Sequence, residues 1–333
     1  MTALLADHVL STGIGSWPGT DMADAIAIAF GEAPELPYLP ELPGRGPHGQ
    51  LVGRTTALLA GLSVDLQPAG WRLTDGSSRE HRVARSTLRS DLDLLEELAQ
   101  GYAGRFKLSA AGPWTLAATM ERPRGDRVLA DSGARRDLGQ SLTQGLGDLT
   151  EELQRRLPDL DLVVQVDEPL LPAVLAGSVP TASGFSRHRV VDLPEASGAY
   201  RQLVDRLGSV PLAVHCCAAG TPVALLHQAG VRALALDLDQ LTTGDWDVLG
   251  AALEAGLVLG LGALPTDRAW SADQVAQRAL VPLRALGLDP ALLTGRLVLT
   301  PACGLAGQTA AAAVQSLRTV RQAAAILTEQ LTD

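Results

Sequence analysis

The stretch PLAVHCCAAGTPVALLHQAGVRALALDLD, residues 211–239, decides the fold class. It opens with a short apolar run, 211–217, and closes with a second one, 231–239. The segment between them, TPVALLHQAG, has the length and the apolar spacing of one helix. Strands joined by a single helix run parallel in one sheet, because parallel neighbours require a crossover connection. This stretch therefore predicts a parallel α/β fold.

Similar apolar runs, separated by segments long enough for helices, occur on both sides of this stretch. They cover residues 8–18, 105–114, 161–169, 256–265 and 295–304, with a weaker one at 62–67. Helical patterns are clearest at 90–104 and 309–317. Together with the two runs at 211–217 and 231–239, the strands number eight. We therefore predict a single-domain (β/α)₈ TIM barrel over residues 1–333, in which the strand at 62–67 is the weakest member.

One segment near the start does not fit the alternation of strands and helices. Residues 31–49, GEAPELPYLPELPGRGPHG, hold too many prolines for a helix or a central strand. We interpret this segment as an ordered arm across the barrel mouth, with a plain surface loop as the alternative.

Composition and charge exclude several classes of function. The net charge is −10, and the arginines are scattered among acids, which argues against a nucleic-acid partner. The three cysteines do not form a disulfide framework, and the first residues lack the pattern of a secretory signal. No apolar run is long enough to span a membrane. We expect a cytoplasmic protein. Lys107 is the only lysine, so little Schiff-base chemistry is available.

In a barrel of this kind, chemistry gathers where the strands end. The polar residues at these positions are Ser16, Asp167, Glu168, His215, Cys216, Cys217, Asp237, Asp239 and Cys303. Alternation along a strand turns His215 and Cys217 to one face and Cys216 to the other. With a carboxylate from the next strand and Cys303, the first pair would make a tetrahedral zinc site. The alternative is a buried structural histidine with inert cysteines.

Five short motifs, in order, resemble the catalytic half of cobalamin-independent methionine synthase. They are STGIGSWPGT, AGPWTL, VQVDEPLL, VHCC with GVRALALD, and TPACGL, between about residue 10 and residue 325. The resemblance implies a TIM barrel with a zinc ion bound by His215, Cys217 and Cys303. The family's glutamate ligand corresponds to Asp237, which is one methylene shorter, and Asp239 faces the same way.

The resemblance also implies a substrate and its contacts. Members of the family bind homocysteine, whose thiol loses its proton on zinc and accepts a methyl group. Asp167, with Glu168 beside it, resembles the acid that binds the substrate ammonium, and we assign Asp167 a catalytic role. The turn Ile14-Gly15-Ser16 resembles the one that holds the carboxylate.

Two departures from the family concern the methyl donor. Longer members carry a second barrel that helps bind folate, and they have an Asp-x-His motif where this chain has Gly262, Ala263, Leu264 and Pro265. A folate amine must be protonated to leave, whereas cobalt(I) leaves without a proton. We therefore predict a non-folate donor such as a methylcobamide, free or on a corrinoid protein.

Three alternatives remain open from the sequence. The acceptor could be a thiol other than homocysteine, which would alter the contacts at Asp167 and Ser16. The barrel could belong to an enzyme like uroporphyrinogen decarboxylase, which needs no metal. The third alternative is a non-catalytic protein that binds zinc or a corrinoid.

Overall fold

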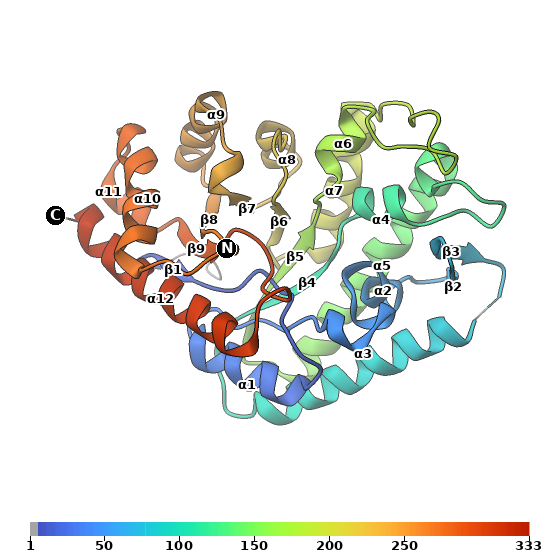
Figure 1. Ribbon diagram of the computed structural model, residues 1–333, viewed down its shortest axis with the longest axis horizontal. Helices are drawn as coiled ribbons and strands as arrows, with labels where there is room; N and C mark the ends of the chain where they lie inside the picture. The colour runs from blue at the N-terminus through green and yellow to red at the C-terminus, as the bar shows by residue number, and fades with distance from the viewer. Residues whose placement is uncertain (1–5, 77, 333) are drawn as a thin grey trace.

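The computed structural model describes residues 6–76 and 78–332. Within them, seven parallel strands form one curled sheet in the middle of the molecule, and helices surround it (Figure 1). The strand order is β1-β9-β8-β7-β6-β5-β4, and every neighbouring pair is parallel. The strands are β1 (Leu10–Ser11), β4 (Gly104–Ala111), β5 (Leu160–Asp167), β6 (Leu212–Cys216), β7 (Ala233–Asp237), β8 (Val258–Leu264) and β9 (Leu297–Pro301). The predicted parallel α/β fold is confirmed.

The weakest predicted strand, at residues 62–67, does not belong to this sheet. Residues Ser63–Gln67 form β2, which pairs antiparallel with β3 (Gly70–Thr74) in a separate two-stranded sheet. The tight connection contains Gly70, whose φ of +123° is a conformation that glycine adopts without strain. The prediction that 62–67 belongs to the barrel is wrong, and eight barrel strands are not confirmed.

The proline-rich segment occupies the gap between the two edges of the curled sheet. Leu39 N donates to Lys107 O (3.0 Å) on β4, and Glu41 N donates to Gly15 O (3.1 Å) just beyond β1. Leu39 and Glu41 are the donors of these hydrogen bonds. The segment therefore tolerates Pro37 and Pro40, which have no N–H group to donate. Residues 36–42 are all buried. Residues 36–42 of the segment are therefore part of the wall, and the arm across the mouth stays a prediction for the rest of residues 31–49.

The helices begin where the sequence offers capping side chains. Asp21, Ser78, Asp131, Asp192, Thr242 and Ser271 each accept a backbone N–H from the first turn of the helix that follows. The helices are α1 (Met22–Glu32), α2 (Leu51–Thr56), α3 (Arg79–Leu98), α4 (Pro113–Thr119), α5 (Ser132–Arg156), α6 (Leu171–Leu175), α7 (Leu193–Leu207), α8 (Val223–Gln228), α9 (Thr243–Glu254), α10 (Ala272–Ala285), α11 (Pro290–Thr294) and α12 (Ala310–Thr332). Short 3₁₀ turns lie at η1 (Pro43–Arg45), η2 (Pro47–Gly49), η3 (Val128–Ala130) and η4 (Leu238–Gln240).

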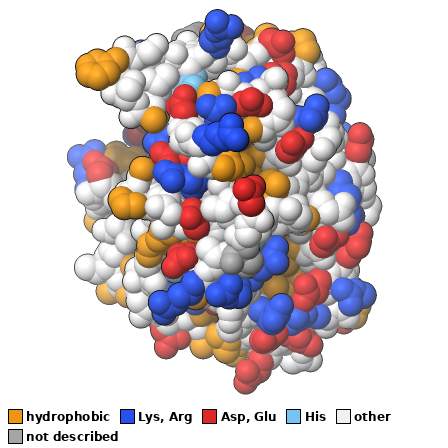
Figure 2. Space-filling model, turned by 90° about the vertical axis from the view of Figure 1, so that its right-hand side faces the viewer, with side chains coloured by type: hydrophobic (Ala, Val, Ile, Leu, Met, Phe, Trp, Pro, Cys, Tyr) orange, Lys and Arg blue, Asp and Glu red, His pale blue; other side chains and the backbone are white. Residues whose placement is uncertain are grey.

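In the described part of the chain, no helix combines the length and apolarity that crossing a membrane requires. On the face shown in Figure 2, arginine and acidic side chains are intermixed rather than gathered by sign. One such pair joins the partly exposed Arg45 to the buried Asp91 by two hydrogen bonds of 2.8 and 2.9 Å.

A small apolar cluster shows which residues point into the curled sheet. It contains Leu10, Leu36, Val163, Ala213, Ala233, Val258 and Val298, drawn from six of the strands and from the wall segment. Side chains two residues apart on a strand face the same way. Asp167 and His215, which are register partners, therefore share the inner face of the sheet. Cys216 faces the other way, into the larger core between sheet and helices.

Candidate metal centre and substrate pocket

Three candidate ligands converge where β6 and β9 end. One ligand atom from each of His215, Cys217 and Cys303 lies within 4.8 Å of the other two. The two sulfur atoms are 3.7 Å apart. Two thiolates on a tetrahedral zinc ion lie about 3.8 Å apart, given zinc–sulfur bonds of about 2.3 Å. The donor set and its spacing therefore fit zinc, with a coordination position left for a further ligand.

A backbone contact fixes the orientation of His215. Its Nδ1 lies 3.0 Å from Ala235 O on β7, so Nδ1 carries the proton and Nε2 is available to a metal. Burial lowers the pKa of His215, but the hydrogen bond with Cys303 and the charge of Asp167 outweigh it and raise the pKa overall. The groups around the ring therefore favour positive charge, either as a proton on the ring or as a metal ion beside it.

The two thiols differ strongly in acidity. The contact with Cys217, and then that with His215, lowers the pKa of Cys303 to about 4. The same sulfur–sulfur contact raises the pKa of Cys217, with burial adding to the effect. The two sulfur atoms thus share one proton. A bound metal ion would displace this proton, so that both cysteines become thiolates.

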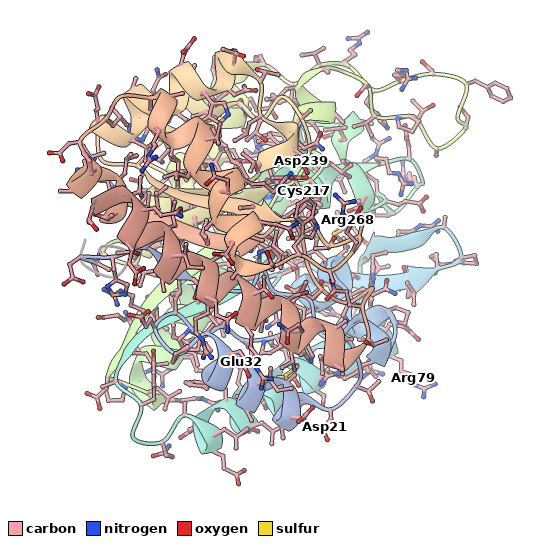
Figure 3. All side chains as sticks on the ribbon, turned by 60° about the vertical axis from the view of Figure 1, so that its left-hand side comes forward. Asp21, Glu32, Arg79, Cys217, Asp239 and Arg268 are labelled. Atoms are coloured by element: carbon pink, nitrogen blue, oxygen red, sulfur yellow. The ribbon has the colours of Figure 1, made fainter. Side chains whose placement is uncertain are left out.

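The two candidate carboxylates at the end of β7 have different partners. Asp237 Oδ1 accepts a hydrogen bond from Asp239 N (3.0 Å) and thereby caps η4. Asp239 itself pairs with Arg278 at 2.6 Å. Within the described residues, the three-ligand group does not include either aspartate. Cys217 and Asp239 are labelled in Figure 3, where they follow neighbouring strands.

Asp167 lies at the end of β5, beside His215, and is 6% exposed. Gln165 Nε2 donates to its Oδ1 at 2.7 Å. Burial raises the pKa of Asp167 to about 7, with a further increase from the charge of Glu41, while His215 acts in the opposite direction. The side chain predicted to bind the substrate ammonium is therefore a carboxyl group whose charge a nearby cation would stabilise.

Hydrogen bonds to two of its carbonyl groups hold the turn Ile14-Gly15-Ser16 in place. Ile14 O accepts from Gln165 Nε2 (3.0 Å) and from Lys107 Nζ (3.1 Å). Ser16 O accepts from Leu305 N at 2.9 Å. A Cβ at position 304 would lie 1.9 Å from Ser16 Oγ, so Gly304 allows the Ser16 side chain to pack directly against the residue after Cys303. The predicted carboxylate turn and the last metal ligand are thus built as one unit.

Glu168 lies outside this pocket. It is completely buried, and its carboxylate accepts hydrogen bonds from Trp114 N, Thr115 N, Thr115 Oγ1 and Tyr200 Oη at 2.7 to 3.0 Å. Burial raises its pKa to about 7, against these four donors. Glu168, which directly follows β5, is therefore an internal anchor for the start of α4, whereas the sequence led us to expect a substrate-facing position.

Sequence reasoning missed Glu41, which belongs to the wall segment. Its carboxylate accepts from Ser109 Oγ (3.1 Å) and lies 3.4 Å from Arg54 Nη1. A Cβ added to Gly15 would be 4.0 Å from its carboxyl carbon. Glu41 thus borders the predicted carboxylate turn, and its charge acts on Asp167. A single acid in the otherwise apolar run of residues 36–42 was the available signal, and the prolines obscured it.

Comparisons with known proteins agree with this architecture. Residues 112–326 match the model of the family described as cobalamin-independent synthase, catalytic domain. A search among curated proteins finds no match.

Many solved structures match this one, and two of them are described here. A B12-independent methionine synthase from Shewanella sp. W3-18-1, in complex with selenomethionine, gives a TM-score of 0.64 at 13% identity over 98% of this chain and 99% of that chain. Methylaspartate ammonia lyase from Clostridium tetanomorphum gives 0.43 at 15% identity over 97% of this chain and 60% of that chain. At such identities the first similarity shows the fold. The family match covers well over half of the sequence, and we conclude that the chain belongs to the cobalamin-independent synthase family and contains its catalytic domain.

Proposed function

We propose that the protein transfers a methyl group to the thiol of homocysteine and so produces methionine, with a zinc ion held by His215, Cys217 and Cys303. The observation that carries this proposal is the convergence of these three side chains within 4.8 Å at the strand ends of a catalytic domain of this family. Zinc would supply Lewis acidity that lowers the pKa of the substrate thiol.

The chain's own residues would orient the acceptor. Asp167 and Glu41 present carboxylates to its ammonium group, and the turn at Ile14–Ser16 presents backbone groups to its carboxylate. These contacts would place the sulfur beside Cys217 and Cys303. The new sulfur–methyl bond forms as the donor–methyl bond breaks, and the thiol gives up its proton.

For the fourth protein ligand we propose Asp237. It lies two residues after Ala235, the register partner of His215, and therefore faces the inside of the sheet as His215 does. Asp239 is already paired with Arg278. A substrate thiol would then replace this carboxylate on the zinc ion or bind as an additional ligand.

The methylcobamide prediction gains no support from a family described as cobalamin-independent. We propose a reduced folate carrying its methyl group on N5 as the donor. The proton lost by the thiol then balances the proton gained by N5, so the reaction consumes no net proton. Formation of methionine should be measured with methyltetrahydrofolate and, separately, with methylcobalamin.

The direct test is zinc content together with sulfur counting. Elemental analysis of protein purified under reducing conditions should give about one zinc per chain. X-ray absorption at the zinc edge should then show one more sulfur neighbour when homocysteine is added. A protein that holds no zinc under metal-replete conditions, or whose zinc gains no sulfur, contradicts the proposal.

A further inference from the structure

Lys107 has no role in the function proposed so far, although it is the only lysine of the sequence and lies inside the curled sheet. It is 4% exposed. Placing an ammonium group in such a position costs several kcal/mol unless polar partners compensate. Its partners are three oxygen atoms: Gly13 O at 2.5 Å, Ile14 O at 3.1 Å and Gln165 Oε1 at 2.7 Å. Three acceptors match the three donors of an ammonium group.

The contact with Lys107 determines which way the Gln165 amide faces. An ammonium group only donates, so the oxygen of the amide must point toward Lys107. The NH₂ group then points the opposite way, where it donates to Ile14 O (3.0 Å) and Asp167 Oδ1 (2.7 Å). Lys107 on one side and the two acceptors on the other thus favour the same orientation of the amide, and loss of Lys107 would leave Gln165 Oε1 without its donor.

The charged groups around Lys107 link it to the same carboxylate, Asp167. Burial lowers the pKa of Lys107 to about 7, and the charges of Asp167 and Glu41, both almost completely buried, act in the opposite direction and favour the ammonium form. Arg54 pairs with Glu41 at 3.4 Å, so Lys107 is left as the resident ammonium group that acts on Asp167. The ammonium group of an amino acid would be a further cation for the Asp167 carboxylate, which a thiol without an amino group does not supply.

We propose that Lys107 is a positioning residue that makes the site selective for thiols bearing an amino-acid group. It holds the turn at Gly13–Ile14 and, through Gln165, the carboxylate of Asp167. The two groups that contact opposite ends of the amino acid are therefore fixed relative to each other by one buried side chain. This inference rests on the proposed function, since it concerns recognition of the same acceptor.

The test compares acceptors that differ only at the amino-acid end. Homocysteine has both groups, 3-mercaptopropylamine keeps only the ammonium, 4-mercaptobutyrate keeps only the carboxylate, and propanethiol has neither. In Lys107→Met, KM for homocysteine should rise at least tenfold, while kcat/KM for propanethiol stays within about twofold of the wild type. The zinc content should be unchanged, because no metal ligand is touched.

Gln165→Met provides a second route to the same result, since it breaks the contact between Lys107 and Asp167 without removing a charge. The double variant should be no worse than Lys107→Met alone, because the two residues act in one chain of contacts. Arg45→Met is the control, since it removes a cation from the pair with Asp91, away from the site. It should lower stability and leave the homocysteine KM unchanged.

The outcomes separate the two proposals. If the wild type does not methylate homocysteine with any donor, the proposed function fails. If the wild type is active but both single variants lose activity equally toward homocysteine and propanethiol, or lose none, the role of Lys107 in selectivity is overturned. A variant that does not fold is replaced in this comparison by the other one.

Discussion

The sulfur atoms of Cys217 and Cys303 lie 3.7 Å apart, although 86 residues separate them in the sequence. Cys216, the immediate neighbour of Cys217, is 1% exposed and packs in the core on the opposite side of the sheet. The adjacent thiols therefore occupy two different environments, and their substitution should have different consequences.

We expect Cys217→Ala and Cys303→Ala to lose most of the bound zinc, because each removes one of three converging ligands. Cys216→Ala should keep about one zinc per chain and lose only stability, by about 1 kcal/mol for the smaller buried side chain. Elemental analysis and denaturant unfolding of the three variants measure both effects. Equal zinc loss in all three would contradict the assignment of the ligands.

Asp237→Asn should weaken zinc binding at least tenfold, because an amide is a poorer ligand than a carboxylate. Asp239→Asn should leave the affinity within about threefold, since it alters an ion pair with Arg278. Competition with a chromophoric chelator gives both constants. The opposite ranking would move the fourth ligand to Asp239.

Glu168→Ala should lower the free energy of unfolding by about 3 to 5 kcal/mol, because it leaves four buried donors without an acceptor. Glu168→Gln keeps the size and part of the acceptor capacity, so its loss should be smaller. Denaturant unfolding provides the comparison. A neutral effect of the alanine variant would show that the anchor at the start of α4 is not needed.

Gly13→Ala should destabilise the protein by about 2 kcal/mol or more, because its Cβ would lie 2.5 Å from the ring of the buried Tyr38. Gly31→Ala in α1 is the matched control. Its Cβ meets no atom of the described chain within 4 Å, and alanine favours the helix by about 0.5 to 1 kcal/mol. The two variants should shift the unfolding midpoint in opposite directions.

Stability should fall as the solution becomes acidic, and His81 should account for part of the loss. Burial, together with the charge of Arg85, lowers its pKa in the folded state. A lowered histidine pKa means that the folded state binds fewer protons, so its stabilising contribution is present above about pH 6.5 and is lost as pH falls. His81→Gln should flatten this part of the profile in unfolding experiments. His8→Gln should change the slope in the other direction, because Asp7 and Glu35 raise the pKa of His8.

The fold could be predicted from sequence wherever apolar strands are continuous. Runs such as 161–169 and 256–265 became β5 and β8 because both faces of a parallel strand are buried. Residues 37–41 could not be found by this rule, because two prolines interrupt them. Their place in the wall depends on hydrogen-bond partners on β4 and near Gly15, which only the folded structure supplies.

The site was partly predictable for a related reason. His215, Cys217 and Cys303 follow recognisable strands, and chemistry at strand ends is a property of the fold class. Gln165 and Lys107 lie within strands, where polar side chains carry no positional signal of their own. The exclusion of Glu168 from the pocket also depends on tertiary contacts, since it adjoins Asp167 in the sequence but meets donors from α4 and α7.

The pairing of β1 with β9 has a consequence for the chain as it leaves the ribosome. Leu10 is synthesised early and its register partner Val298 late, so the first strand emerges long before its neighbour exists. Cys303 follows that neighbour by only a few residues, and a nascent chain that has exposed His215 and Cys217 still lacks it. Completion of the sheet and completion of the ligand set are thus the same late event. A chain interrupted before β9 would hold two ligands beside an unpaired strand edge, a state that chaperones and proteases recognise by its exposed surface.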